Sequence, residues 1–235
     1  REGPPGGPGR STLEDRKDMN RTTLALLLGT GLTLALAAPA RRAEASSIQT
    51  IDTQTLSAGT FNSSFVPYNT ATLSPFRFDG SSTDSGLVES QVFKGVGAQE
   101  GVYAYAYQIA VNPTTANGEP VHVDSISTTF GATPLGSDLN NAGQTAYGYV
   151  IKNGQVGGLN LSGTQVPSSL SWQPGQTTGF IRAQYVDPAS QTQSLAAGTN
   201  SATFVLLSTQ APANVQPTVN VGGAAATTTS PVAYT

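Results

Sequence analysis

The chain has 235 residues, of which 11% are charged, and its formal net charge at pH 7 is −3. It contains no cysteine, which excludes thiolate catalysis, disulfide frameworks and cysteine-based zinc sites. Beyond position 45, four basic residues stand against nine acidic ones. This balance excludes a basic surface for nucleic acid, because such binding depends on neutralising phosphates.

The first 45 residues predict a leader that does not belong to the folded domain. Residues 1–18 are rich in Gly, Pro and charge, and we expect them to be disordered because they cannot bury a core. Met19 then precedes an apolar run from Leu24 to Ala38, and a small-x-small cleavage pattern ends at Ala45. We therefore predict a secretory signal peptide over residues 19–45, and a secreted protein that is extracellular or lies on the outer cell surface. An uncleaved anchor is the alternative, but the run is shorter than the roughly 20 residues of a membrane span, so we expect none in the mature chain.

Short alternating runs follow the leader, each closed by Gly, Pro or Asn, and helical periodicity is scarce. We expect about eight strands from this spacing. They cover residues 48–56, 86–94, 102–111, 121–130, 146–152, 169–172, 177–186 and 202–209.

Strands at this spacing without intervening helices are typical of layered antiparallel sheets. The sequence therefore predicts an all-β domain over residues 46–210, an antiparallel β-sandwich with a jelly-roll or immunoglobulin-like topology. A closed barrel is the alternative. Residues 211–235 are rich in Pro, Ala and Thr, and we expect either an edge strand or a flexible C-terminal tether there.

Two breaks between the runs carry Asn-Gly pairs. Asn and Gly both tolerate the left-handed backbone that two-residue hairpins require. The first pair, Asn117-Gly118, predicts a turn with positive φ, and the second, Asn153-Gly154, predicts a hairpin.

A row of aromatic residues, Tyr103, Tyr105 and Tyr107, continues into Ile109 and Val111 at every second position. These five side chains share one face of a strand. A face that changes from rings to branched aliphatic residues is typical of a core, and we expect it to be buried. An exposed binding platform is the alternative.

Three aromatic residues are candidates for carbohydrate binding. Tyr147 and Tyr149 repeat the alternation in a later strand, and Trp172, the only tryptophan, precedes a Pro-Gly turn. Their rings could stack on a sugar. The alternative for Trp172 is that it caps one end of the core.

Polar candidates for metal or acid–base chemistry are few. Asp79 and Asp84 concentrate oxygen ligands in the loop "DGSSTDSG", which predicts a calcium site or an Asx-rich turn without metal. We expect no other cofactor. His122 is the only histidine; Asp124 lies two residues on, but we expect the imidazole to face solvent, because neighbours on one strand face rarely meet edge to edge.

Two segments of the chain resemble those of a known family. They are "YAYAYQIAVNPTTANGEPVHVDSISTTFG" at residues 103–131 and "SLSWQPGQTTGF" at residues 169–180. Together with the leader and the cysteine-free β domain, they resemble the exported domain of PEP-CTERM proteins of bacteria. The resemblance implies sorting to the cell surface or matrix, an association with exopolysaccharide, and no catalytic residues. The family's C-terminal sorting tail, with its Pro-Glu-Pro motif and hydrophobic run, does not occur before Thr235.

These features together predict a secreted, non-catalytic structural protein of the cell surface or extracellular matrix. The expected partners are extracellular polysaccharide or further copies of the chain. Two alternatives are a filament or coat subunit that assembles by strand pairing, and a carbohydrate-binding module. We do not expect an enzyme, because one histidine and no cysteine supply no set of nucleophile, base and orienting group.

Overall fold

The computed structural model describes residues 47–78, 80–161, 163–175, 179–186, 194–212, 218–223 and 228–231, the last two ranges by their backbone alone. The predicted extension over residues 1–18 and the predicted signal peptide over residues 19–45 lie outside these residues. Among the described residues, no helix has the length and apolar character that crossing a membrane requires.

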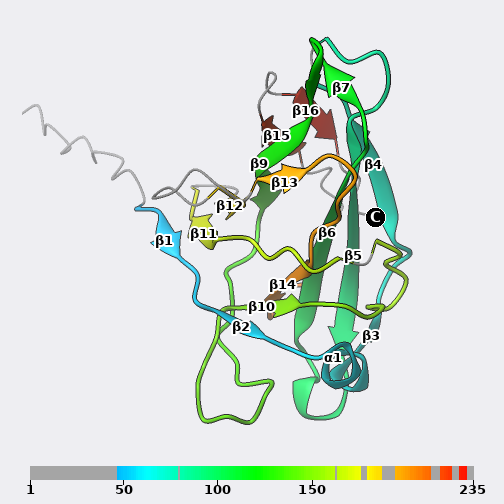
Figure 1. Cartoon of the computed structure of the whole chain (residues 1–235). Helices are drawn as coiled ribbons and strands as arrows, with labels where there is room; N and C mark the ends of the chain where they lie inside the picture. The colour runs from blue at the N-terminus through cyan, green and yellow to red at the C-terminus, as the bar shows by residue number, and fades with distance from the viewer. Residues whose placement is uncertain are drawn as a thin grey trace, which may run out of the picture. The chain divides into compact units, whose positions relative to one another are not determined.

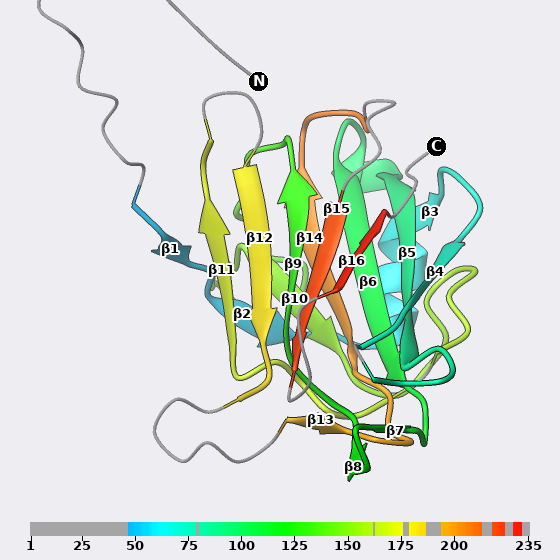
Figure 2. The same cartoon turned by 90° about the horizontal axis from the view of Figure 1, so that it is seen from above.

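The first sheet consists of antiparallel strands, which lie side by side in Figure 2. In sheet order they are β1 (Gln49–Thr50), β11 (Ser169–Gln173), β12 (Gly179–Gln184), β9 (His122–Phe130), β15 (Thr218–Gly223) and β16 (Thr228–Pro231); β13 (Leu195–Ala196) also pairs with β9.

The second sheet has the long central strands of the domain, and all its pairs are antiparallel except β2 with β10. In sheet order its strands are β2 (Thr53–Thr55), β10 (Gly148–Ile151), β14 (Thr203–Ser208), β6 (Tyr103–Val111), β5 (Gly86–Gly95) and β3 (Phe65–Pro67); β4 (Thr72–Phe76) also pairs with β5. Outside both sheets are α1 (Ala58–Ser64), the 3-10 turn η1 (Gly97–Gln99) and a small ribbon of β7 (Thr115–Ala116) and β8 (Glu119–Pro120).

One hydrophobic cluster draws side chains from both sheets. Tyr105 and Tyr107 of β6 lie in it together with Ile126 and Phe130 of β9, and the rings of Tyr105 and Phe130 meet edge to face at 5.1 Å. The tyrosine row is therefore core, as the alternation predicted. The all-β antiparallel prediction is confirmed, while the β-sandwich and its jelly-roll or immunoglobulin-like topology stay predictions.

A second cluster covers the opposite face of the second sheet. Ala104 and Ala106, which alternate with the tyrosines in β6, pack there with Val205 and Leu207 of β14. The cover is formed by α1 and by loop residues such as Leu139, Val156 and Leu159. The central strands of the second sheet are consequently buried on both faces, which small and apolar side chains at successive positions allow.

The helix α1 was not predicted, but its sequence contains a start signal. Ser57 is the N-cap, and its hydroxyl accepts a hydrogen bond from the Thr60 N–H at 3.0 Å. Phe61 is fully buried, and its ring stacks on Phe65 and meets Phe93 edge to face, each at 5.0 Å. This aromatic group holds α1 beside the ends of β3 and β5 (Figure 1).

The two Asn-Gly pairs have different outcomes. Asn117 and Gly118 have φ angles of 55° and 85° and connect β7 to β8, as predicted. Asn153 and Gly154 also have positive φ, but no hairpin forms, and this prediction is wrong. The reason is that β2 and β14 occupy both edges of β10, so no edge is left for the chain after the turn.

The segment predicted as one strand over residues 48–56 is divided between the two sheets. Its first part, β1, pairs with β11, and its second part, β2, pairs with β10. Ile51 is buried between them, where its N–H donates to Leu170 O at 2.8 Å. At the other end of the chain, β15 and β16 fall within residues 211–235, for which an edge strand or a tether was expected.

Candidate functional site

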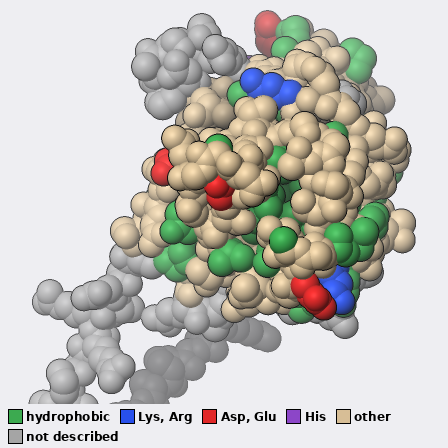
Figure 3. Space-filling view, turned by 90° about the horizontal axis from the view of Figure 1, so that it is seen from below, with side chains coloured by type: hydrophobic (Ala, Val, Ile, Leu, Met, Phe, Trp, Pro, Cys, Tyr) green, Lys and Arg blue, Asp and Glu red, His purple; other side chains and the backbone are tan. Residues whose placement is uncertain are grey.

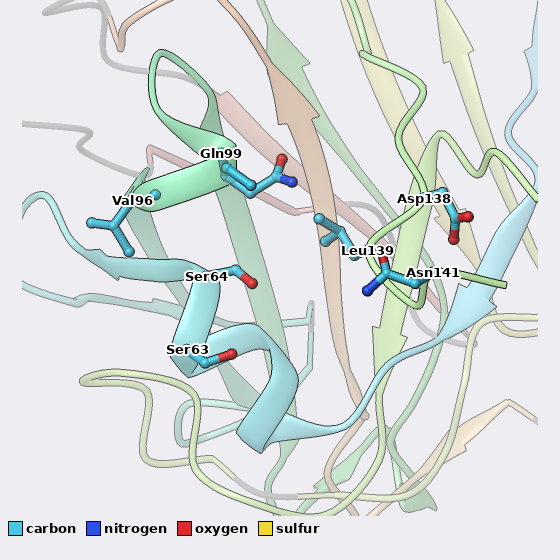
Figure 4. Close-up of a pocket in the computed structure, with 9 residues that line it drawn as sticks. Ser63, Ser64, Val96, Gln99, Asp138, Leu139 and Asn141 are labelled. Carbon is cyan, nitrogen blue, oxygen red and sulfur yellow. The ribbon is translucent and has the colours of Figure 1, made fainter. Parts of the chain in front are cut away.

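A polar pocket of about 280 Å³ lies between the end of α1, η1 and the loop at residues 138–141 (Figure 4). Its apolar lining residues are the buried Leu139 and the partly exposed Val96, whose side chain points away from Leu139 in Figure 4. Its rim carries the hydroxyls of Ser63 and Ser64 from α1, together with side-chain amides from the other two elements. The pocket therefore combines short apolar contacts with neutral hydrogen-bonding groups.

Three polar side chains of the pocket, those of Ser64, Gln99 and Asn141, make no hydrogen bond to any described residue. In Figure 4 they surround Leu139. Asn141 has a φ of 53°, a left-handed conformation that Asn adopts more readily than most residues. Each of these groups can both donate and accept a hydrogen bond.

The loop that carries Asn141 is fixed by its own polar contacts. The carboxylate of Asp138 accepts hydrogen bonds from the N–H groups of Ala142 at 3.0 Å and Gly143 at 2.7 Å. The hydroxyl of Tyr149 accepts the Leu139 N–H at 3.1 Å and donates to Ser137 O. Burial raises the pKa of Tyr149, and these hydrogen bonds oppose the shift only in part. The wall of the pocket is therefore formed before any ligand arrives.

A second candidate surface is the outer face of the first sheet, meaning the residues of β11, β12 and the second half of β9 that alternate with the core residues; among them Ser125 and the hydroxyl of Thr129 are buried. These side chains alternate with the buried ones and lie in register, so that Ser171 stands opposite Arg182, and Arg182 opposite Ser127. Arg182 is the only charged one, and Phe180 is 44% exposed. The full set is Ser169, Ser171, Gln173, Phe180, Arg182, Gln184, Ser125, Ser127 and Thr129.

Neutral polar groups also cover most of the opposite side of the domain. Figure 3 shows that face with few charged groups, and the hydrophobic side chains are grouped near its centre. A surface that carries so few charges interacts with its surroundings chiefly through hydroxyl and amide groups.

The structure does not bring the three predicted carbohydrate residues together. Tyr149 is 0% exposed, so its ring has no face on which a sugar could stack. Tyr147 is 48% exposed and precedes β10 of the second sheet. Trp172 lies in the first sheet and packs against the shared core, in agreement with the capping alternative.

The predicted calcium loop can be placed only in part, because Asp79 lies outside the described residues. Asp84 is exposed, and its carboxylate is 3.6 Å from the guanidinium of Arg77. Side chains this accessible gain little from such a pair. The calcium site stays a prediction.

The sequence predicted that His122 faces solvent. In the structure its side chain is 34% exposed and also lies beside a carboxylate. Its Nε2 is 3.5 Å from Oδ1 of Asp124. The same Oδ1 accepts a hydrogen bond from the Ser194 hydroxyl at 2.6 Å. Since this hydroxyl donates to the carboxylate and not to the imidazole, the group lacks the serine–histidine contact that activates a nucleophile.

Buried polar residues in β5 were missed by sequence reasoning. Glu89 is 0% exposed, and its Oε2 accepts hydrogen bonds from the N–H groups of Asn160 at 2.8 Å and Leu161 at 3.0 Å. Two residues on, Gln91 accepts the Gly158 N–H at 2.8 Å. These side chains fasten the loop at 157–161 to the sheet. The available signal was their presence in an otherwise strand-forming run, "GLVESQVFKG".

No protein family model, no curated protein and no solved structure matches this chain. The PEP-CTERM resemblance therefore stays a prediction that depends on the quoted motifs alone.

Proposed function

We propose that this chain is a secreted, non-catalytic structural protein of the cell surface or extracellular matrix, and that it binds extracellular polysaccharide through the outer face of the first sheet. The observation that carries the proposal is the in-register array of exposed and partly exposed hydroxyl and amide side chains around Phe180 on that face, those of Ser169, Ser171, Gln173, Gln184 and Ser127. The central strands of the second sheet offer no such face, because both of their sides are covered.

The chemistry of the outer face suits a polysaccharide. Sugar hydroxyls pair with groups that both donate and accept, which Ser, Thr and Gln supply. Because β9, β11 and β12 are neighbouring strands about 4.8 Å apart, such groups repeat along the surface at a regular spacing. Phe180 offers an apolar surface for the C–H face of a sugar ring. The secretion part of the proposal depends on the signal-peptide pattern over residues 19–45.

The test is a depletion assay in which the protein is incubated with insoluble polysaccharides, such as cellulose and chitin, and the free protein is measured. Phe180→Ala should lower the bound fraction at least threefold, because the variant loses ring contact worth about 1 kcal/mol. Leu73→Ala is the matched control, since Leu73 is also an exposed strand residue but lies on β4. Equal binding by the two variants, or no binding by the unaltered chain, would refute the proposal.

Self-assembly is a second candidate, and the N-terminal arm at residues 47–56 supports it. The arm pairs by its backbone with one edge of each sheet, and only Ile51 and Leu56 anchor it by burial. Backbone pairing at sheet edges can equally join two copies of a chain. Fibres in electron micrographs, or a dimer by light scattering, would support this function, whereas a monodisperse monomer at all concentrations would refute it.

A further inference from the structure

We infer that the pocket between α1, η1 and the loop at 138–141 binds a single neutral sugar ring, at a site separate from the outer face of the first sheet. The two surfaces share no residue. The inference therefore goes beyond the polysaccharide proposal and can succeed or fail independently of it.

The polar groups of the pocket select a neutral ligand. Ser64, Gln99 and Asn141 present uncharged groups without partners among the described residues. Among the described residues that line the pocket, Asp138 alone is charged, and it already accepts two backbone N–H groups of its own loop. Because no described lining residue is a cation, a phosphate or carboxylate has no countercharge there, and a ligand with adjacent hydroxyls matches the hydroxyl and amide groups instead.

The size of the pocket selects one ring. Its volume of about 280 Å³ lies below the roughly 300–1,000 Å³ of sites for drug-sized ligands. Leu139 provides the apolar contact for the C–H face of the ring. A ligand of this size in a preformed site is expected to bind with a Kd on the order of 1 mM.

The pocket is also built to hold its shape. Phe61 fixes α1 through its ring contacts, and Asn140 ties the loop to the N-terminal arm by donating to Gln54 Oε1 and Thr55 O, each at 3.1 Å. Rigid walls lower the entropy cost of ordering side chains on binding.

The test is an NMR titration of the full chain with methyl β-D-glucopyranoside, a neutral single-ring probe. We expect saturable shifts of the amide signals of Gly97, Gln99 and Asn141. Asn141→Gly should weaken binding about two- to tenfold, because it removes the side-chain hydrogen bonds. Glycine keeps the left-handed conformation at this position, so the loop should remain folded.

Asn153→Gly is the matched control, since Asn153 has a φ of 55° on an exposed turn outside the pocket. Its affinity should equal that of the unaltered chain. Three results would overturn the inference. They are an absence of shifts in the pocket signals at probe concentrations well above the expected Kd, an equal loss of probe affinity in both variants, or shifts confined to the outer face around Phe180. Shifts confined to the outer face would not affect the polysaccharide proposal. Conversely, if the probe shifts the pocket signals but the chain binds no polysaccharide in the depletion assay, only the polysaccharide proposal is refuted.

Discussion

The buried carboxylate of Glu89 offers the sharpest test of how the second sheet is covered. Its Oε2 accepts two backbone N–H groups of the 157–161 loop, and its Oε1 has no partner among the described residues. Gln108 stands directly opposite on β6, and its Oε1 also has no partner among them. Two acceptors thus lie on neighbouring strands without a donor.

We predict opposite effects for two neutral variants. In Glu89→Gln the remaining oxygen can still accept both loop N–H groups, and the new amide supplies a donor beside Gln108. This variant should be at least as stable as the unaltered chain, because a donor is added beside buried acceptors that lack a partner among the described residues. Glu89→Leu removes the acceptor, and each lost hydrogen bond costs about 0.5–1.5 kcal/mol, hence about 1–3 kcal/mol for the two.

The assay is urea unfolding at one pH, and the quantity to compare is the difference in the free energy of unfolding between the Gln and Leu variants. Both variants are neutral, so this difference isolates the hydrogen bonds from the cost of burying charge. Glu89→Leu should also lose amide-exchange protection at Asn160 and Leu161. Equal stability and equal protection in the two variants would refute the role of Glu89 in holding the loop.

Three further outcomes are expected. Phe61→Ala should lower the free energy of unfolding by about 3–5 kcal/mol, because Phe61 is fully buried between two rings; a loss below 1 kcal/mol in urea would contradict the packing of α1. Gly86→Ala should destabilise the domain, since its Cβ would lie 2.3 Å from Ala110 O, whereas Gly131→Ala, with open space, should change the urea midpoint little. Burial raises the pKa values of Tyr105, Tyr149 and Tyr185 above the ordinary 10.0, so phenolate absorbance should show at least three tyrosines that resist titration while the chain is folded. Because the folded state holds these protons more tightly, the stabilisation they contribute is complete below pH 10 and falls as the pH rises further. A free energy of unfolding that does not change as the pH is raised above 10 would contradict their burial.

Local alternation was sufficient to place most of the large strands. The predicted runs at 86–94, 102–111 and 121–130 correspond to β5, β6 and β9, whose bounds are Gly86–Gly95, Tyr103–Val111 and His122–Phe130. Alternation succeeds there because it reports a property of the strand itself, namely which side chains share a face. Short elements such as β3 and β13 pair with longer strands and leave no such pattern.

The candidate site was not predictable in the same way. The pocket joins a helix end, a 3-10 turn and a loop that are separate in sequence, and no motif marks Ser64, Gln99 or Asn141. Tyr149 shows that alternation does not tell which core a ring joins. Its alternation with Tyr147 matched that of Tyr103 and Tyr105, yet its ring lies in the second core and anchors the pocket loop.

By itself, then, the sequence determined the all-β class, the positions of the long strands and the burial of the tyrosine row. Only the tertiary structure decided that the arm at residues 47–56 divides between two sheets, that the central strands of one sheet are covered on both faces, and that the other sheet keeps a mainly polar outer face. The physical reason is that periodicity fixes which residues share a face, whereas the cover of each face comes from segments distant in the chain, whose packing no local pattern encodes.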